Sequence, residues 1–169
     1  GEVLRVVFSA PAGLAVGLFS PVFFAALFIR KNLRVANRGA GPARLARALS
    51  PRLGLPRNDV TLYPLGGAWS RERALHRRDL RPGLVKFGSN NGASGNRCNP
   101  FFFLGELGAT ETTGEVYGFN LVYSGSQEAS VALDALGRPR VMQGIWSAGF
   151  GWTLEPGDSF ISPEAVPTF

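Results

Sequence analysis

The sequence contains almost no cysteine, histidine or methionine, since each occurs once among 169 residues. The single cysteine, Cys98, excludes a disulfide within the chain and a cysteine-rich zinc site. With His76 as the only histidine, a catalytic zinc centre is also poorly supplied with ligands. No phosphate-binding loop, dinucleotide fingerprint or calcium loop occurs in the sequence. We therefore predict neither a metal nor a cofactor.

Lysine is also rare, because Lys31 and Lys86 are the only lysines among 18 basic residues. The net charge of +6 is therefore carried by arginine. Such an excess of arginine fits a GC-rich genome as well as a polyanion-binding surface. Basic charge without a recognisable binding module is weak evidence for nucleic-acid binding. We predict that nucleic acid is not a partner.

Glycine and proline, by contrast, are abundant, with 22 and 12 residues scattered without a fixed period. They mark frequent turns and favour an all-β domain over a helical bundle. A hydrophobic content of 45% excludes a disordered chain, and the length suits one domain with its own core.

The stretch GEVYGFNLVYSG (114–125) has the clearest strand pattern, because its side chains alternate strictly and it closes with Ser-Gly. One face carries Val116, Gly118, Asn120 and Val122, and the other carries Tyr117, Phe119, Leu121 and Tyr123. Further strands are expected at residues 33–37, 60–65, 128–133, 141–145 and 150–154. We expect residues 101–104 to be buried on both faces, and Phe150, Trp152 and Leu154 to face inward. Short strands at this spacing, separated by turns rich in Gly and Pro, indicate a β-sandwich.

Residues 10–29 carry no charge and are followed by two basic residues, as in a transmembrane helix or a signal peptide. The run is interrupted by Pro11, Gly13, Gly17, Ser20 and Pro21. In a helix interior Pro21 would cost about 3 kcal/mol relative to alanine. Two strands, at residues 14–18 and 22–29, place the breaks at ends or edges and are favoured. A membrane segment is the alternative.

Several short motifs surround the 114–125 strand. They are Asn99-Pro100-Phe101, GRPRVMQGI (137–145), Phe150-x-Trp152-x-Leu154, Pro156-Gly157 and Phe160-x-x-Pro163-Glu164. Together with the strand they resemble the N-terminal domain of family 36 glycoside hydrolases, the bacterial and fungal α-galactosidases. The resemblance implies an antiparallel β-sandwich of the galactose-mutarotase-like supersandwich type. It also implies that residues 1–169 are the later part of that domain, an incomplete sandwich in which the strands before Gly13 are largely missing.

In that family the nucleophile and the acid/base are aspartates on a (β/α)₈ barrel that follows the sandwich. None of the 12 acidic residues of this chain stands in a setting that indicates glycoside hydrolysis. The resemblance therefore implies a non-catalytic domain of an α-galactosidase that acts on sugars such as raffinose and melibiose. We expect it to cap the barrel, help shape the sugar pocket and mediate contacts in a homo-oligomer, in a cytoplasmic enzyme. The chain alone is expected to be inactive.

Residues 87–99 form a Gly/Ser/Asn-rich loop, of the kind that approaches ligands closely. The family has Arg-Gly-Ala-Ser-Ser-His-Gln-x-Asn-Pro-Phe here. This chain keeps Gly92, Ala93, Ser94, Asn99, Pro100 and Phe101, and departs at Asn91, Gly95, Asn96 and Arg97. Our candidate substrate-binding or barrel-facing residues are Asn91, Gly92, Ser94, Asn96 and Asn99.

The most charged segment, residues 70–81, reads as a solvated strand or loop. Its Arg71-Glu72-Arg73 and Arg77-Arg78 groups match family positions, which favours structural ion pairing over nucleic-acid binding.

Two other functions stay open. An independent carbohydrate-binding sandwich would use an exposed Trp69, Trp146 or Trp152 as a stacking platform. A secreted or membrane-anchored protein would use residues 10–29.

A sandwich without its opening strands also leaves apolar faces and an edge uncovered, so we expect the isolated chain to aggregate.

Overall fold

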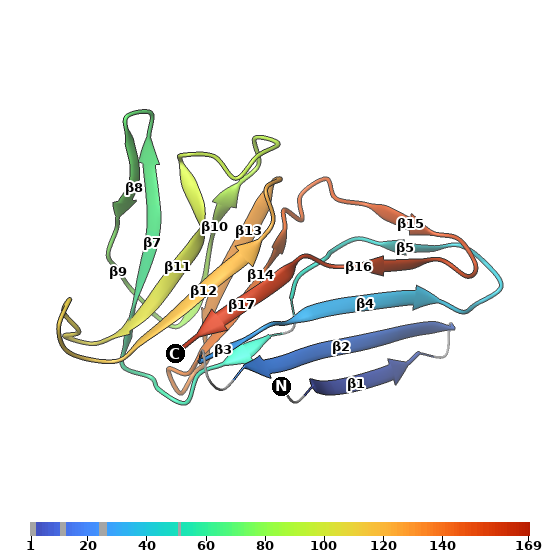
Figure 1. Ribbon diagram of the computed structural model, residues 1–169, viewed down its shortest axis with the longest axis horizontal. Coiled ribbons are helices and arrows are strands. Elements are labelled where there is room, and N and C mark those ends of the chain that lie inside the picture. Colours follow the sequence, from blue (N-terminus) through green and yellow to red (C-terminus); the bar gives the residue numbers. More distant parts are fainter. Residues whose placement is uncertain (1–2, 11–12, 24–26, 51) are drawn as a thin grey trace.

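Regular structure consists of β-strands alone in the part of the chain that the computed structural model describes, residues 3–10, 13–23, 27–50 and 52–169 (Figure 1). The strands are β1 (Val3–Ser9), β2 (Leu14–Phe23), β3 (Phe28–Ile29), β4 (Asn32–Asn37), β5 (Ala43–Leu45), β6 (Leu53–Gly54), β7 (Val60–Ala68), β8 (Arg71–Leu75), β9 (Arg78–Asp79), β10 (Gly83–Ser89), β11 (Cys98–Glu106), β12 (Val116–Val122), β13 (Gln127–Leu133), β14 (Pro139–Ile145), β15 (Trp152–Leu154), β16 (Ser159–Ile161) and β17 (Glu164–Thr168).

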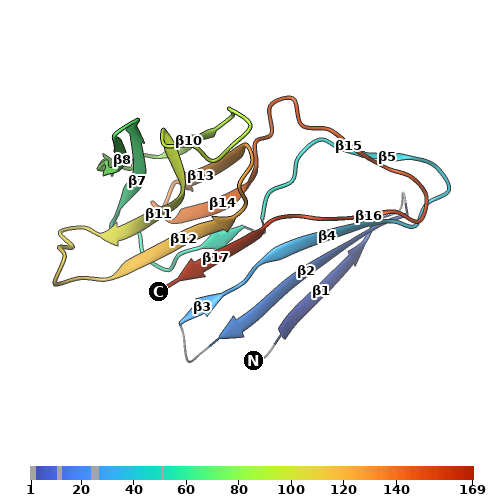
Figure 2. The same ribbon diagram turned by 45° about the horizontal axis from the view of Figure 1, so that its top comes forward.

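Two antiparallel sheets form the sandwich. The large sheet has the order β16-β4-β2-β3-β17-β12-β11-β7-β8, with β1 beside β2 and β9 beside β7. The small sheet has the order β10-β13-β14-β6 and lies behind β7, β11, β12 and β17 (Figures 1 and 2). Strands β5 and β15 pair separately beyond this overlap. The arrangement confirms the antiparallel β-sandwich.

The core fills the space between the two sheets. Phe102 of β11 stacks on Phe119 of β12 with ring centroids 5.0 Å apart, and Phe87 of β10 meets Phe102 edge-on at the same distance. Leu62 and Leu104 are fully buried beside them. Alternation in β12 is confirmed, since Phe119 and Leu121 are buried while Val116 and Val122 are exposed.

The expectation that residues 101–104 are buried on both faces is wrong. Phe102 and Leu104 face the core, but Phe101 and Phe103 lie half-buried on the outer face of the large sheet. The small sheet covers only the inner face of β11, so Phe103 is not buried beneath a second layer. On the outer face Phe103 stacks on Tyr63 of β7, with ring centroids 4.8 Å apart.

The charge-free segment forms strands, although not with the predicted break. Strand β2 is continuous and contains both Gly17 and Pro21, while residues 24–26 lie outside the described part of the chain. Phe19 is the last residue paired with β4, and Val22 is the first paired with β3. Pro21 therefore stands where the ladder changes partner, a position that tolerates a missing N–H group. In the described residues, no helix is long and apolar enough to span a membrane.

Residues 45–55 contribute only short pairings, through β5, β6 and a single bridge between Leu49 and Gly144. The inward orientation expected for Trp152 is wrong as well. Its side chain is 51% exposed, whereas Leu154 is buried. Strand β15 pairs only with β5, so Trp152 has no second sheet above it and packs at its side on Phe160, 5.6 Å between centroids.

Candidate functional site

The loop between β10 and β11 is fixed by hydrogen bonds at its base. The Ser89 hydroxyl donates to the Ala93 carbonyl (2.7 Å), and the Gly92 N–H donates to the Ser126 hydroxyl (2.9 Å). The Ser94 N–H donates to the Ser124 carbonyl (2.9 Å). Gly92 has a φ of +81°, a left-handed conformation that glycine adopts without strain.

The hairpin of β7 and β8 lies opposite this loop. Its two strands lose register between Gly66 and Ala68, and Ser70 and Arg73 have φ values of 64° and 59°. Left-handed backbone at residues other than glycine stores strain and concentrates at functional sites. The Glu72 carboxylate accepts the Ser70 N–H at 2.8 Å, which holds the turn.

A polar groove of about 420 Å³ separates the hairpin from the loop. It is lined by Glu72, Arg73, Ser94, Gly95, Asn96 and Asn99. A second hollow of about 430 Å³ shares Arg73 and Asn99 with it and continues over the large sheet. Its other lining residues are Leu65, Phe101, Asn120, Val166 and Thr168. The groove thus offers amide, hydroxyl, guanidinium and carboxylate groups side by side.

The structure brings together three of the five predicted site residues, Ser94, Asn96 and Asn99. Asn91 and Gly92 are exposed and do not line the groove, and the Gly92 N–H donates to the Ser126 hydroxyl instead. The Asn99 carboxamide oxygen accepts the Phe101 N–H (2.9 Å), so Asn99 fixes the start of β11.

Sequence reasoning missed the hairpin as one wall of this site. Glu72 and Arg73 carried a usable signal in the Arg-Glu-Arg match, but we assigned that segment to ion pairing. Within the described residues, the segment forms a single salt bridge, between Arg77 and Asp79 at 3.4 Å. Structural ion pairing therefore accounts for few of the charged side chains in residues 70–81. Every residue of this segment is exposed except Leu80, which is half-buried.

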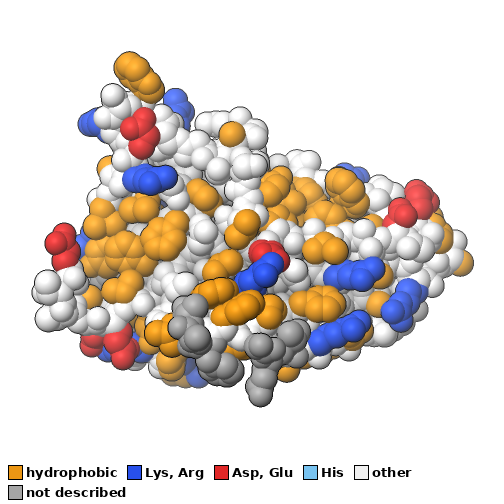
Figure 3. Space-filling view, in the orientation of Figure 1, with side chains coloured by type: hydrophobic (Ala, Val, Ile, Leu, Met, Phe, Trp, Pro, Cys, Tyr) orange, Lys and Arg blue, Asp and Glu red, His pale blue; other side chains and the backbone are white. Residues whose placement is uncertain are grey.

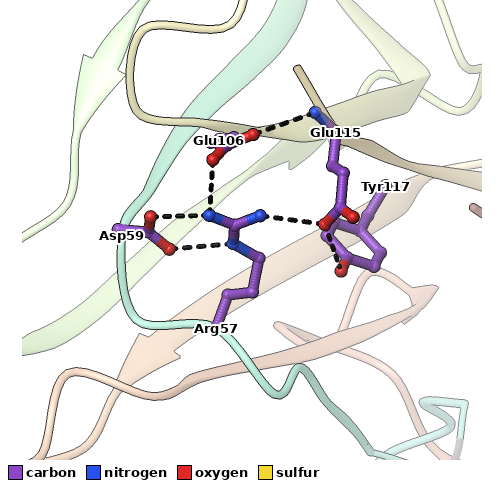
Figure 4. A network of polar contacts seen from close by, with 5 residues as sticks. All are labelled: Arg57, Asp59, Glu106, Glu115 and Tyr117. Carbon is purple, nitrogen blue, oxygen red and sulfur yellow. Dashed lines mark hydrogen bonds and ion pairs between the residues drawn. The ribbon is translucent and has the colours of Figure 1, made fainter.

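A separate charged cluster lies at the opposite end of β11 (Figure 4). The Arg57 guanidinium donates to Asp59 (2.7 and 2.9 Å), Glu106 (2.6 Å) and Glu115 (2.9 Å). Hydrogen bonds from Arg57 lower the pKa of Asp59, and the Glu115 N–H together with Arg57 lowers the pKa of Glu106. A general acid for glycoside hydrolysis needs a raised pKa. These carboxylates instead serve as an electrostatic clamp that joins the start of β7 to β11 and β12.

The three tryptophans have different surroundings. Trp69, in the turn between β7 and β8, is 86% exposed. Trp146 is half-buried beneath the Lys86 ammonium, which lies 4.6 Å from its ring centroid. The exposed Trp152 lies beyond the overlap of the sheets, so the three do not form one platform (Figure 1).

The outer face of the large sheet is strongly apolar beside the groove (Figure 3). Tyr63, Leu75, Phe103 and Val116 line a shallow hollow of about 380 Å³ there, together with residues 105 and 109–111. Leu75 and Val116 are 58% and 43% exposed. Exposed apolar patches of this kind mark interaction surfaces.

Comparisons with known proteins agree on one family. The glycosyl hydrolase family 36 N-terminal domain matches residues 3–155. The α-galactosidase AgaA of Geobacillus stearothermophilus is 40% identical over 169 residues, which are 99% of this chain and 23% of that protein. The α-galactosidase C of Emericella nidulans is 37% identical over 139 residues, 82% of this chain and 18% of that protein.

Solved structures show the same correspondence. A crystal structure of AgaA in complex with raffinose has a TM-score of 0.94 at 39% identity, and covers 98% of this chain and 23% of its own. The α-galactosidase from Lactobacillus brevis also reaches 0.94, at 37% identity, with 98% and 22% covered. The chain spans about a fifth of the length of its curated relatives. It therefore belongs to glycosyl hydrolase family 36 and corresponds to the N-terminal domain of these α-galactosidases.

Proposed function

We propose that the chain acts as the non-catalytic N-terminal domain of an α-galactosidase that removes terminal α-galactosyl residues from oligosaccharides such as raffinose and melibiose. The family match supports this, as do related structures solved with raffinose and stachyose. The domain's part is to shape the sugar pocket and to hold the catalytic barrel.

The groove carries this proposal. Arg73 makes no salt bridge within the described residues, and it lines the groove together with Ser94 and Asn96. Amide and guanidinium donors beside the Glu72 carboxylate suit the alternating donors and acceptors of sugar hydroxyls. We place the groove at the mouth of the barrel, where it contacts the part of the sugar that extends outward.

The apolar outer face is the second element of the proposal. Tyr63, Phe103 and Val116 continue the floor of the site away from the groove, and their partial exposure needs a covering partner. We assign that partner as the barrel of the same enzyme, because its docking here would close the groove from one side. Burial of such a face stabilises the pair by about 25 cal/mol per Å² of apolar surface.

The test is a chimera in which this chain replaces the matching segment of the Geobacillus enzyme. Asn96→Ala and Arg73→Gln should each lower kcat/KM for raffinose, by between about twofold and tenfold for one lost neutral hydrogen bond and more for Arg73. Asn91→Ala is the matched control, since it removes an exposed asparagine of the same loop that does not line the groove. Equal effects of Asn91→Ala and Asn96→Ala would contradict the proposal.

The β7–β8 hairpin is the part of the domain we assign to contacts with a second copy of the enzyme. It projects beyond the sheet (Figure 1), and a nearly fully exposed tryptophan at its turn is typical of an interface anchor. In the chimera, Trp69→Ser should shift the oligomer toward smaller species in light scattering. Trp152→Ser, which removes an exposed tryptophan elsewhere, should not.

The 169-residue chain by itself should not hydrolyse p-nitrophenyl α-galactoside, since the described acidic clusters are held by arginine. Turnover by the purified chain above that of a mock purification would contradict this.

A further inference from the structure

A basic pocket opens between the two sheets at their edge, separate from the groove. It has a volume of about 280 Å³ and is lined by Pro64, Leu65, Gly66, His76, Arg78, Phe87, Gly88, Arg97 and Cys98. Phe87, which packs on the core ring of Phe102, closes its inner end. The pocket therefore reaches from solvent to the edge of the core.

Two irregularities in the large sheet create this hollow. Strand β11 shifts register between Cys98 and Phe102, and β7 does so between Gly66 and Ala68. Such bulges re-aim side chains and terminate pairing, and they are frequent beside functional sites. At Gly66 an added Cβ would lie 3.0 Å from His76 Nε2 and 3.2 Å from the Arg97 carbonyl. The glycine thus lets the imidazole lie against the backbone inside the pocket.

The charge of the lining is of one sign. His76, Arg78 and Arg97 are basic, and no acidic residue lines the pocket. Neither arginine forms a salt bridge within the described residues, although the adjacent Arg77 does. Burial raises the pKa of the Cys98 thiol, and the charge of Arg78, which lines the same pocket, acts on that pKa in the opposite direction. Unpaired cations in a hollow attract an anion.

Arg97 supplies the second guanidinium group of the pocket. Arginine guanidinium groups match the oxygens of a phosphate in geometry as well as in charge. Two arginines and an imidazole suit a dianion better than a single carboxylate, and the volume leaves room for a small group attached to it.

We infer that the pocket formed by His76, Arg78 and Arg97 is a binding site for the phosphate group of a small molecule. Its position between the sheets, apart from the groove, makes it independent of the sugar contacts proposed above. A bound group would contact both sheets, because the lining residues come from β7, β9 and β11 of the large sheet and from β10 of the small one.

Cys98 reports on occupancy, since it lines the pocket and is the only thiol of the chain. Alkylation of Cys98 by iodoacetamide is followed in the purified chain at fixed pH and at concentrations too low for aggregation, in sodium phosphate and in sodium chloride of equal ionic strength. A phosphate ion in the pocket should slow alkylation severalfold. A hexose phosphate added at the same phosphate concentration distinguishes the sources: stronger protection assigns a phosphorylated sugar, and equal protection assigns inorganic phosphate.

Arg78→Gln and Arg97→Gln should each weaken phosphate protection about tenfold in concentration. Arg77→Gln is the control, because it removes a neighbouring arginine that does not line the pocket. The thermal midpoint gives a second readout, which phosphate should raise in the parent chain and not in the Arg78→Gln, Arg97→Gln double variant. Equal alkylation in phosphate and chloride, or protection that survives in the double variant, would overturn the inference, and the pocket would then be left to a carboxylate of a neighbouring domain.

Discussion

Among the described residues, Glu128 is the most buried charge, and its replacement by glutamine tests how that burial is compensated. The carboxylate is 1% exposed and accepts hydrogen bonds from the Ser147 N–H and hydroxyl, both at 2.8 Å. Lys86 Nζ lies 2.5 Å away and Arg47 3.3 Å away. These partners come from β10 (Lys86), from the segment after β14 (Ser147) and from the segment between β5 and β6 (Arg47).

The size of the effect follows from these partners. Breaking a buried ion pair by removing one member costs about 3–5 kcal/mol. Here the side chains of Lys86 and Arg47 are 34% and 51% exposed, so both cations regain water when the charge is lost. Glutamine can still accept from Ser147. We therefore expect Glu128→Gln to lower the free energy of unfolding by about 2 kcal/mol.

The pH dependence gives a sharper test. Burial raises the pKa of Glu128, but hydrogen bonds from Lys86 and Ser147 outweigh it and leave the pKa below its ordinary value. A carboxyl whose pKa is lowered by folding stabilises the folded state fully at pH values above its unfolded-state pKa, about 4.3. This stabilisation is lost as the pH falls through the pKa of the folded state. The difference between the parent chain and Glu128→Gln should therefore shrink from pH 7 toward pH 3.

Pulse proteolysis in urea measures this at concentrations too low for aggregation. Glu111→Gln is the control: it changes an exposed loop glutamate that forms no ion pair within the described residues, and should cost less than about 0.5 kcal/mol. If Glu128→Gln is neutral at pH 7, or its cost grows on acidification, the reasoning is refuted.

Three further outcomes follow from the fold. Arg57→Met should lower the thermal midpoint, and the loss should fade below about pH 4, because Arg57 contributes to the lowered pKa values of Asp59 and Glu106; a loss independent of pH would point to packing. Gly144→Ala should destabilise by about 1–3 kcal/mol in urea unfolding, since the added Cβ would lie 2.2 Å from the Ala48 carbonyl, whereas Gly54→Ala meets nothing within 4 Å and should be tolerated. The isolated chain should aggregate through the apolar outer face, and a monodisperse monomer in light scattering would contradict that.

Strand positions were readable from the sequence where one face is buried and the other is not. The alternation of residues 116–122 predicted the strand because the core lies on one side of β12 only. The shorter strand at residues 32–37 was predicted for the same reason. Alternation does not tell whether a second layer covers a face. That is why Trp152 and Phe103, apolar and correctly placed in strands, were assigned the wrong surroundings.

The candidate site was only partly readable for a related reason. Asn91 and Asn96 are the same residue type in the same loop, but only Asn96 lines the groove. The loop's conformation depends on contacts distant in sequence, such as the hydrogen bond from Gly92 to Ser126, 34 residues away. The other wall of the groove comes from a hairpin some 20 residues upstream, whose charges suggested ion pairs. Glu128 is a similar case, because a glutamate in a strand indicates solvent until Lys86 and Ser147 are placed beside it.

The position of β17 has a consequence for how the domain is made. On one side β17 pairs with β12 and on the other with β3, so the path of strands through the large sheet crosses between its two halves at this strand. During synthesis from the N-terminus, β1 to β4 and β7 to β12 leave the ribosome well before residues 164–168, and must wait as separate pieces with open edges. Strand β17, which joins the two halves, is synthesised after strands β1 to β16. Within this domain, the large sheet can therefore be completed only after residues 164–168 have been synthesised, and its edges stay open until then.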